Sequence, residues 1–234
     1  MRSPWVAISL RQSQDVFTLI VTIDGPAGAG KSSIAHQVAS QLAFEFLDTG
    51  ALYRAATLAA IRAQLNLQDA EALAQFVRSL EIAWQDRAVR LCGEDVSELI
   101  RSPEVTKSIR YLADVPAVRA QLSQIQRDIA CGRDIVTEGR DQGAEVFPDA
   151  DCKVFLTASP VERAKRRMRQ LADSGRYVTL EEVLSAQNQR DLEDRMRDVG
   201  RLRAAEDAVV INTDGMLPEE VMREIVSLVR SRIE

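Results

Sequence analysis

Unbroken apolar runs alternate along the chain with stretches in which apolar residues recur at helical spacing. Residues 16–23 (VFTLIVTI) are apolar and largely β-branched, which predicts a strand buried on both faces of a parallel sheet. Ile34, Val38 and Leu42 share one face of a predicted helix over 31–42. Further strands are predicted at 44–47, 135–137, 153–157 and 208–212, and further helices at 52–64, 69–79, 116–132, 160–174, 179–197 and 218–232. This alternation predicts an α/β fold with helices on both faces of a parallel sheet.

One segment breaks the helical pattern. In residues 81–91 (EIAWQDRAVRL) apolar side chains occupy alternating positions on both sides of Asp86 and Arg87. Two short alternating runs joined by a polar turn are typical of a β-hairpin. We therefore expect a small antiparallel sheet inserted in an otherwise helical region.

The length and composition favour a folded unit of moderate size. The 234 residues suffice for one α/β domain with insertions or for two small domains. Apolar residues make up 46% of the chain, enough for a sizeable core. The net charge of −5 argues against a nucleic-acid-binding surface, which normally needs a strongly basic face, but it leaves room for a local basic pocket.

The cysteines and the N-terminal residues indicate the cellular compartment that we expect for the protein. Cys92, Cys131 and Cys152 are odd in number and widely spaced, so we expect a reduced, cytoplasmic protein without a disulfide framework or zinc site. No stretch reaches the roughly 18 apolar residues that a membrane span needs. Residues 1–15 have a short apolar stretch and no small-residue cleavage site, so we interpret them as an N-terminal extension rather than a signal peptide.

The strongest chemical signal is GPAGAGKS, which begins at Gly25 and fits the pattern G-x-x-x-x-G-K-[ST]. Glycines let backbone N–H groups converge on phosphate oxygens, while the lysine and the helix N-terminus add positive charge. Because a strand is predicted before the loop and a helix after it, we interpret the loop as a nucleotide-binding site rather than as a plain turn, although the loop alone does not separate kinases from motors or GTP switches. The predicted nucleotide-binding residues are Gly25, Pro26, Ala27, Gly28, Ala29, Gly30, Lys31, Ser32 and Ser33. Ser32 is placed to reach Mg²⁺, with the Ser33 hydroxyl beside it.

A second motif, DTGALYR over 48–54, follows the second predicted strand. Ligands of open α/β sheets bind at this end of the strands. The motif offers the Thr49 hydroxyl, the Tyr53 phenol and the Arg54 guanidinium, which suit a second anionic substrate opposite the glycine-rich loop. The alternative is a capped helix with a surface arginine.

A third motif, EGRD over 138–141, follows the strand predicted at 135–137. An acidic side chain next to Arg140 suits an electrostatic role near phosphates or Mg²⁺. An ordinary salt bridge in a turn explains the same pattern equally well.

Two predicted helices are dense in charge. Arg163, Arg166, Arg167 and Arg169 crowd the first, and Arg190, Asp194 and Arg197 share one face of the second. Such runs usually form a solvated helix surface. Four arginines without matching acids are less usual, and phosphoryl transfer needs several cations around the transferring group.

Together these motifs resemble the bacterial cytidylate (CMP) kinase family. The resemblance covers nearly the whole chain and rests on IDGPAGAGKSS, FLDTGALYR, GEDVSELIRSPEV, EGRDQG followed by VFPDA, FLTASPVERAKRR and QRDLEDRMR. It implies a three-layer P-loop kinase domain over 16–234. The implied core covers about 16–51, 120–157 and 198–234, the monophosphate-binding insertion with the small antiparallel sheet covers about 52–119, and the helical lid with its adjoining helices covers about 158–197.

The resemblance also implies roles for individual residues. The implied catalytic residues are Lys31, Arg140, Arg190, Arg163 and Arg167. The implied substrate-binding residues are Thr49, Arg54 and Arg140 for the CMP phosphate, Arg190 and Asp194 for the ribose, Arg119, Asp141 and Arg197 for cytosine, and Tyr53 and Arg110 near them. Arg110 stands where the family often has a serine, and Ala144 stands where it usually has a threonine.

The implied reaction transfers a phosphoryl group from ATP to CMP or dCMP with Mg²⁺, a step of pyrimidine nucleotide metabolism. We expect a cytoplasmic monomer that binds neither nucleic acid nor membranes. Two alternatives stay open, namely a kinase for another small acceptor and a regulatory P-loop switch. A GTP switch would need the guanine-reading sequence Asn-Lys-x-Asp, which the chain lacks.

Overall fold

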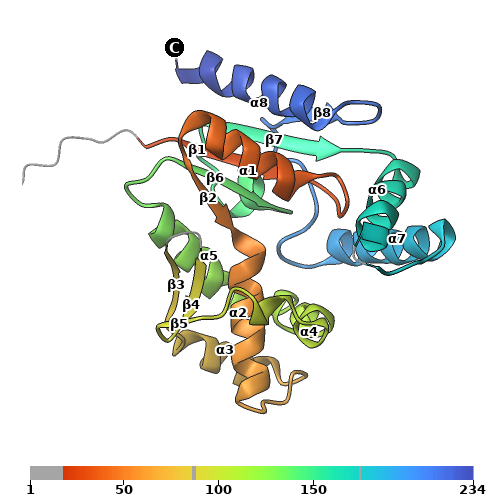
Figure 1. Ribbon diagram of the computed structural model, residues 1–234. Coiled ribbons are helices and arrows are strands. Elements are labelled where there is room, and N and C mark those ends of the chain that lie inside the picture. Colours follow the sequence, from red (N-terminus) through yellow and green to blue (C-terminus); the bar gives the residue numbers. More distant parts are fainter. Residues whose placement is uncertain (1–17, 86–87, 174, 234) are drawn as a thin grey trace, which may run out of the picture.

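The computed structural model of the chain describes residues 18–85, 88–173 and 175–233 (Figure 1). Its central sheet has five parallel strands in the order β2-β6-β1-β7-β8. The strands are β1 (Ile20–Asp24), β2 (Glu45–Asp48), β6 (Ile135–Gly139), β7 (Cys152–Thr157) and β8 (Val209–Asn212). The α/β fold with a parallel sheet is therefore confirmed. The predicted extension over 1–15 and the predicted start of the first strand at Val16 lie outside the described residues.

The first strand lies in the middle of the sheet because its residues are buried on both sides. Val21 pairs with Val136 of β6 and with Cys152 of β7, and both Val21 and Ile23 are fully buried. The strand ends at Asp24, so the glycine-rich loop leaves the sheet at its carboxyl edge.

Helices cover both faces of the sheet (Figure 1). Helices α1 (Lys31–Leu42) and α8 (Pro218–Ile233) pack on one face, where Val38 and Ile225 join a cluster with Ile23 and Val154. Helices α2 (Thr49–Arg62) and α5 (Pro116–Ala130) share the second cluster with Leu47 and Ile135 of the sheet.

The region between β2 and α5 forms a lobe around a three-stranded antiparallel sheet, and its buried residues belong to the second cluster together with Leu47 and Ile135 of the central sheet. This sheet contains β3 (Ile82–Gln85), β4 (Ala88–Leu91) and β5 (Glu94–Asp95), and α3 (Ala70–Arg78) precedes it. The predicted hairpin is confirmed, with Ile82 opposite Leu91. The third strand, the 3₁₀ turn Leu99–Arg101 and helix α4 (Pro103–Ala113) were not predicted. The Ser102 side chain caps α4, and Pro103 opens it.

The start of α2 differs from the prediction. The helix begins at Thr49 rather than at residue 52, because the Asp48 carboxylate accepts a hydrogen bond from the Ala51 N–H at 3.0 Å and caps the first turn. Thr49 and Tyr53 are thus both helical, one turn apart at the carboxyl edge of the sheet.

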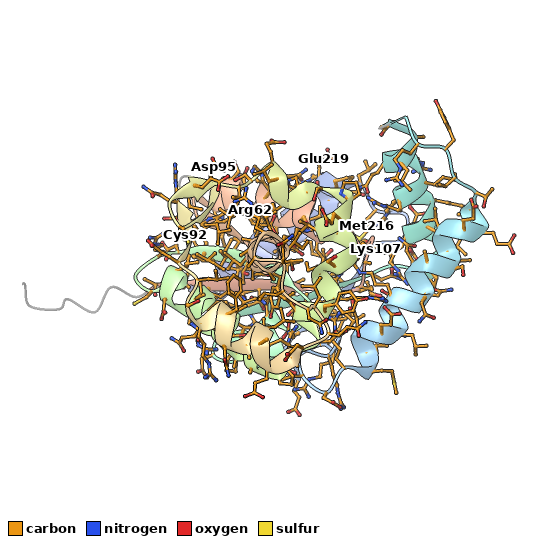
Figure 2. All side chains as sticks on the ribbon, turned by 90° about the horizontal axis from the view of Figure 1, so that it is seen from below. Arg62, Cys92, Asp95, Lys107, Met216 and Glu219 are labelled. Atoms are coloured by element: carbon orange, nitrogen blue, oxygen red, sulfur yellow. The ribbon has the colours of Figure 1, made fainter. Side chains whose placement is uncertain are left out.

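Helices α6 (Pro160–Asp173) and α7 (Leu180–Met196) pack against each other beside the carboxyl edge of the sheet. A capping box between Thr179 and Glu182 starts α7. The view from below shows this pair on the side opposite to Arg62, Cys92 and Asp95 of the inserted lobe (Figure 2). Among the described residues, no helix combines the length and apolar character that a membrane crossing needs.

Candidate active site

The glycine-rich loop over 25–33 connects β1 to α1 and is shaped by positions that only glycine fits. A Cβ on Gly25 would lie 2.1 Å from the carbonyl oxygen of Leu156, and one on Gly28 would lie 2.6 Å from Gln187 Nε2. Both glycines have positive φ, 146° and 81°. Among the described residues no side chain caps the N-terminus of α1, and its first turn has no acidic residue. Its first N–H groups and its dipole therefore favour an anion.

Lys31 opens α1 and is almost completely buried. Its ammonium group donates a hydrogen bond to the Pro26 carbonyl at 2.9 Å. Burial, with a contribution from Arg140, lowers the pKa of Lys31 to about 7. A bound polyphosphate would favour the charged form, so nucleotide binding and protonation of this side chain are coupled.

Glu138, at the end of β6, links the loop to the second motif. The Ser32 hydroxyl lies 2.9 Å from Glu138 Oε1, and the Thr49 hydroxyl donates to the Glu138 carbonyl at 2.8 Å. Ser33 is exposed beside Ser32 in the first turn of α1. Hydroxyl and carboxylate oxygens are ligands that Mg²⁺ prefers, and Mg²⁺ commonly takes only one or two protein ligands beside phosphates and water. These residues fit such an ion.

A cluster of arginines surrounds Asp194 near the end of α7. Asp194 accepts a hydrogen bond from Arg140 Nε at 2.9 Å and forms a salt bridge with Arg197, with Nη1 at 2.8 Å. Burial alone would raise the pKa of Asp194, but Arg140 and Arg197 together hold it below its ordinary value. Burial and the charge of Arg140 lower the pKa of Arg190. The charges of Arg140 and Arg190 also help to lower the pKa of Lys31, so these cations lie near one another between the glycine-rich loop and α7.

Arg119 and Asp141 form a buried ion pair deeper in the site. The guanidinium carbon of Arg119 lies 5.5 Å from the centre of the Tyr53 ring. Burial raises the pKa of the Tyr53 phenol to about 12, so this group stays protonated. Two of the three predicted base-reading residues are thus adjacent. The third, Arg197, bonds instead to Asp194 and to Asp114, at 2.7 Å from Arg197 Nε.

Other predicted substrate residues lie nearer the rim. Arg54 donates to the Thr106 hydroxyl at 2.8 Å from a half-buried position on α2. Arg110 is exposed on α4, with its guanidinium 5.1 Å from the Tyr111 ring. It lies outside the buried group around Arg119.

The arginines of α6 differ from the prediction that they lack matching acids. Arg163 is buried, pairs with Asp191 of α7 at 2.6 Å and donates to the Ala27 carbonyl at 2.9 Å. Arg166 pairs with Glu162 at 3.1 Å. Asp191 lies on α7, which packs against α6, so the sequence of α6 alone gave no sign of its pairing with Arg163. Arg167 and Arg169 are exposed.

Asp24 is a buried acid that was not among the predicted site residues. Its carboxylate accepts hydrogen bonds from the N–H groups of Gln142 and Gly143 at 2.9 and 2.8 Å. Burial raises the pKa of Asp24 to about 7. It ties the end of β1 to the π-helical turn Gln142–Val146 that follows Asp141. The sequence offered one signal for this residue, because Asp24 is an acidic residue at the end of the apolar run that forms β1.

A glycine-rich loop on a helix N-terminus, a buried lysine and a converging group of arginines define a P-loop kinase. Comparisons with known proteins agree with this class. The family model described as cytidylate kinase matches residues 21–231. The chain belongs to the cytidylate kinase family.

Individual relatives give the same result. A cytidylate kinase of Rhodopirellula baltica is 61% identical over 216 residues, covering 92% of this chain and 94% of that protein. One of Desulfitobacterium hafniense is 44% identical, covering 92% and 94% of the two chains. The crystal structure of an uncharacterised protein from Eubacterium ventriosum is similar in fold alone, with a TM-score of 0.52, 12% identity, and coverage of 92% of this chain and 99% of the other.

Proposed function

We propose that this enzyme transfers the γ-phosphoryl group of ATP to CMP or dCMP, giving CDP or dCDP. The observation that carries the proposal is a connected group of charged side chains between Lys31 and the buried Arg119–Asp141 pair. The charges of Arg140 and Arg190 act on Lys31, Arg140 and Arg197 both pair with Asp194, and the charge of Arg197 acts on Asp141. Such an arrangement suits a donor phosphate at one end and a base at the other. Membership of the cytidylate kinase family supports the same acceptor.

The loop residues 25–33 would hold the phosphates of ATP. Ser32, with Glu138 behind it, would hold Mg²⁺, with the Ser33 hydroxyl nearby. When bound, Mg²⁺ neutralises charge that develops on the phosphate oxygens. Lys31 would donate to the transferring phosphoryl group as it moves.

The acceptor phosphate would lie among Thr49, Arg54 and Arg140, with Arg190 and Asp194 next to the ribose. Arginine donors fixed by buried acids need little reorganisation during the reaction, so they stabilise the charge of the transition state effectively. Arg163 holds the lid hairpin against the loop through Ala27, and Arg167 is exposed on the same helix. We propose that both contribute to closing the site over ATP, which excludes water.

Base selection would follow from hydrogen-bond complementarity. Cytosine offers acceptors at O2 and N3 and a donor at its amino group, whereas uracil reverses the last two. Arginine only donates and an ionised carboxylate only accepts, so Arg119 and Asp141 suit cytosine. Each mismatch with uracil would leave a desolvated group unpaired and cost about 1–3 kcal/mol.

A coupled assay of ADP release against a panel of nucleoside monophosphates tests the proposal. We expect CMP and dCMP to be preferred over UMP by at least about a hundredfold in kcat/KM. UMP turnover within about tenfold of CMP turnover would contradict this account of the base pocket. Preference for another small acceptor would support a different kinase, and slow ATP hydrolysis unaltered by CMP would support a regulatory switch.

We further propose that the enzyme acts as a cytoplasmic monomer in pyrimidine nucleotide metabolism and binds neither nucleic acid nor membranes. The net charge of −5 supports the absence of a nucleic-acid partner, because binding such a partner normally needs a strongly basic face.

A further inference from the structure

Gly200 lies between α7 and β8, and its backbone rests on the guanidinium of Arg119. A Cβ built on Gly200 would lie 1.8 Å from Nη2 and 1.9 Å from Cζ of Arg119. Its φ of 71° is also in the left-handed region, which side chains other than glycine rarely adopt. Any side chain at this position would displace either Arg119 or the segment that carries Gly200.

Arg119 has little room to yield. It is 6% exposed, is paired with Asp141, and donates to the Ala113 carbonyl at 3.3 Å. Its guanidinium also lies over the Tyr53 ring. Because these contacts all constrain the same group, displacement by a side chain at position 200 would disturb the ion pair with Asp141.

The segment that carries Gly200 is itself anchored on both sides. The Gly200 N–H donates to Glu145 Oε2 at 2.8 Å, and the Leu202 N–H donates to the Asp194 carbonyl at 2.9 Å. Just before Gly200, Arg197 bonds to Asp194 and Asp114. The segment that follows α7 is therefore held directly against the buried guanidinium of Arg119, which we have proposed to read the base.

We propose that Gly200 is a positioning residue for the pyrimidine-binding site, where its bare backbone holds the Arg119 guanidinium in the orientation that reads the base. The proposal rests on the proposed function for the identity of the base. It also couples the lid to base recognition, because Gly200 follows the last lid helix within a few residues.

Gly200→Ala tests this role, with Gly215→Ala as a matched control. Gly215 has a nearly identical φ of 75°, but a Cβ there would meet no atom within 4 Å. Both variants carry similar backbone strain, so Gly215→Ala measures the loss of thermal stability that strain alone causes, and Gly200→Ala should lose more because its Cβ also meets Arg119. Only Gly200→Ala should lower kcat/KM for CMP, by about tenfold to a hundredfold through KM, with KM for ATP unchanged. CMP kinetics of Gly200→Ala equal to those of Gly215→Ala would overturn the proposal.

Glu145 offers a second route that leaves glycine in place if Gly200→Ala does not fold. Glu145→Ala removes the acceptor of the Gly200 N–H, whereas Glu145→Gln keeps an oxygen in the same place. We expect a raised KM for CMP in the first variant and recovery toward the wild-type value in the second. Wild-type KM in both variants would show that the segment does not position Arg119.

A readout without substrate separates this proposal from the proposed function. The side-chain ¹⁵N resonance of Arg119, assigned with Arg119→Lys, should match the wild type in Gly215→Ala and shift in Gly200→Ala. If wild-type enzyme fails to phosphorylate CMP, the proposed function fails while this comparison still decides the positioning role. An unchanged Arg119 resonance in folded Gly200→Ala would overturn it.

Discussion

Asp194→Asn should destabilise the protein substantially, because the buried Asp194 carboxylate is shared by two partly buried arginines, Arg140 and Arg197. Asp194 is 3% exposed, accepts a hydrogen bond from Arg140 and forms a salt bridge with Arg197. An asparagine keeps one acceptor oxygen, loses the charge, and turns an amide donor toward a guanidinium. Removing one partner of a buried ion pair costs about 3–5 kcal/mol.

Because asparagine keeps one acceptor oxygen, we expect Asp194→Asn to lower the free energy of unfolding by an amount at the lower end of this range, about 3 kcal/mol. For a chain of this size the corresponding drop in Tm is roughly 6–12 °C. The repulsion between Arg140 and Arg190, which Asp194 offsets, acts in the same direction. Urea unfolding at pH 7, followed by circular dichroism, measures the difference.

Asp114→Asn provides a matched control. Asp114 bonds to the same Arg197, at 2.7 Å, but its side chain is 54% exposed. Exposed pairs contribute about 0–1 kcal/mol, so this variant should unfold almost like the wild type. Equal losses in the two variants would refute the reasoning from burial.

The pH dependence gives an independent check on the same carboxylate. The folded-state pKa of Asp194 is below its unfolded value, so its contribution to stability is present above the unfolded pKa and is lost as pH falls through the folded pKa. The stability gap between wild type and Asp194→Asn should therefore be full at pH 7 and shrink as the solution is acidified below about pH 4. A gap that stays constant under acid would assign the loss to packing rather than to charge.

Three further predictions follow from the site. Lys31→Ala should lower kcat by at least about a hundredfold in steady-state assays while leaving the fold intact by circular dichroism, because a contact made mainly in the transition state is lost; near-normal turnover would contradict the role of Lys31. Residues of about 158–197 should gain protection from hydrogen exchange when a bisubstrate analogue binds, and equal protection in both states would argue against a lid there. Asp24 has a folded pKa raised to about 7 from 3.8, so the folded state holds a proton that the unfolded state releases between these values, and stability should fall by roughly 3 kcal/mol from pH 4 to pH 7. Asp24→Asn should flatten that slope in urea titrations, and an unchanged slope would exclude Asp24 as its source.

The sequence predicted those parts of the fold that depend on local patterns. The apolar run of β1 and the spacing of Ile34 and Val38 in α1 identify a buried strand and an amphipathic helix without tertiary information. The early start of α2 was missed because the cap from Asp48 overrides the weak helical pattern of its first residues. Helix α4 was missed because Pro103, which often marks a break, here opens the helix.

The candidate site was less accessible to sequence reasoning because its decisive contacts join distant positions. The pairing of Arg163 with Asp191 spans two helices, and that of Arg119 with Asp141 joins α5 to the loop after β6. A charge-dense helix looks the same in sequence whether its arginines face solvent or buried acids. The resemblance to a family named Arg119 and Asp141 together, but only the fold shows that they are in contact.

The pattern of paired arginines also bears on how the site binds an anion. Arg140, Arg197 and Arg119 each already bond to a carboxylate, which keeps their guanidinium groups oriented before substrate arrives. Asp194 balances only part of the positive charge, because Arg190 adds a further cation to the group around Asp194. The surplus stays available to a phosphate, and the low exposure of Arg140 and Arg197 limits screening of their charges by salt. A chain with a net charge of −5 can therefore concentrate positive potential in one place, which a total over the sequence does not reveal.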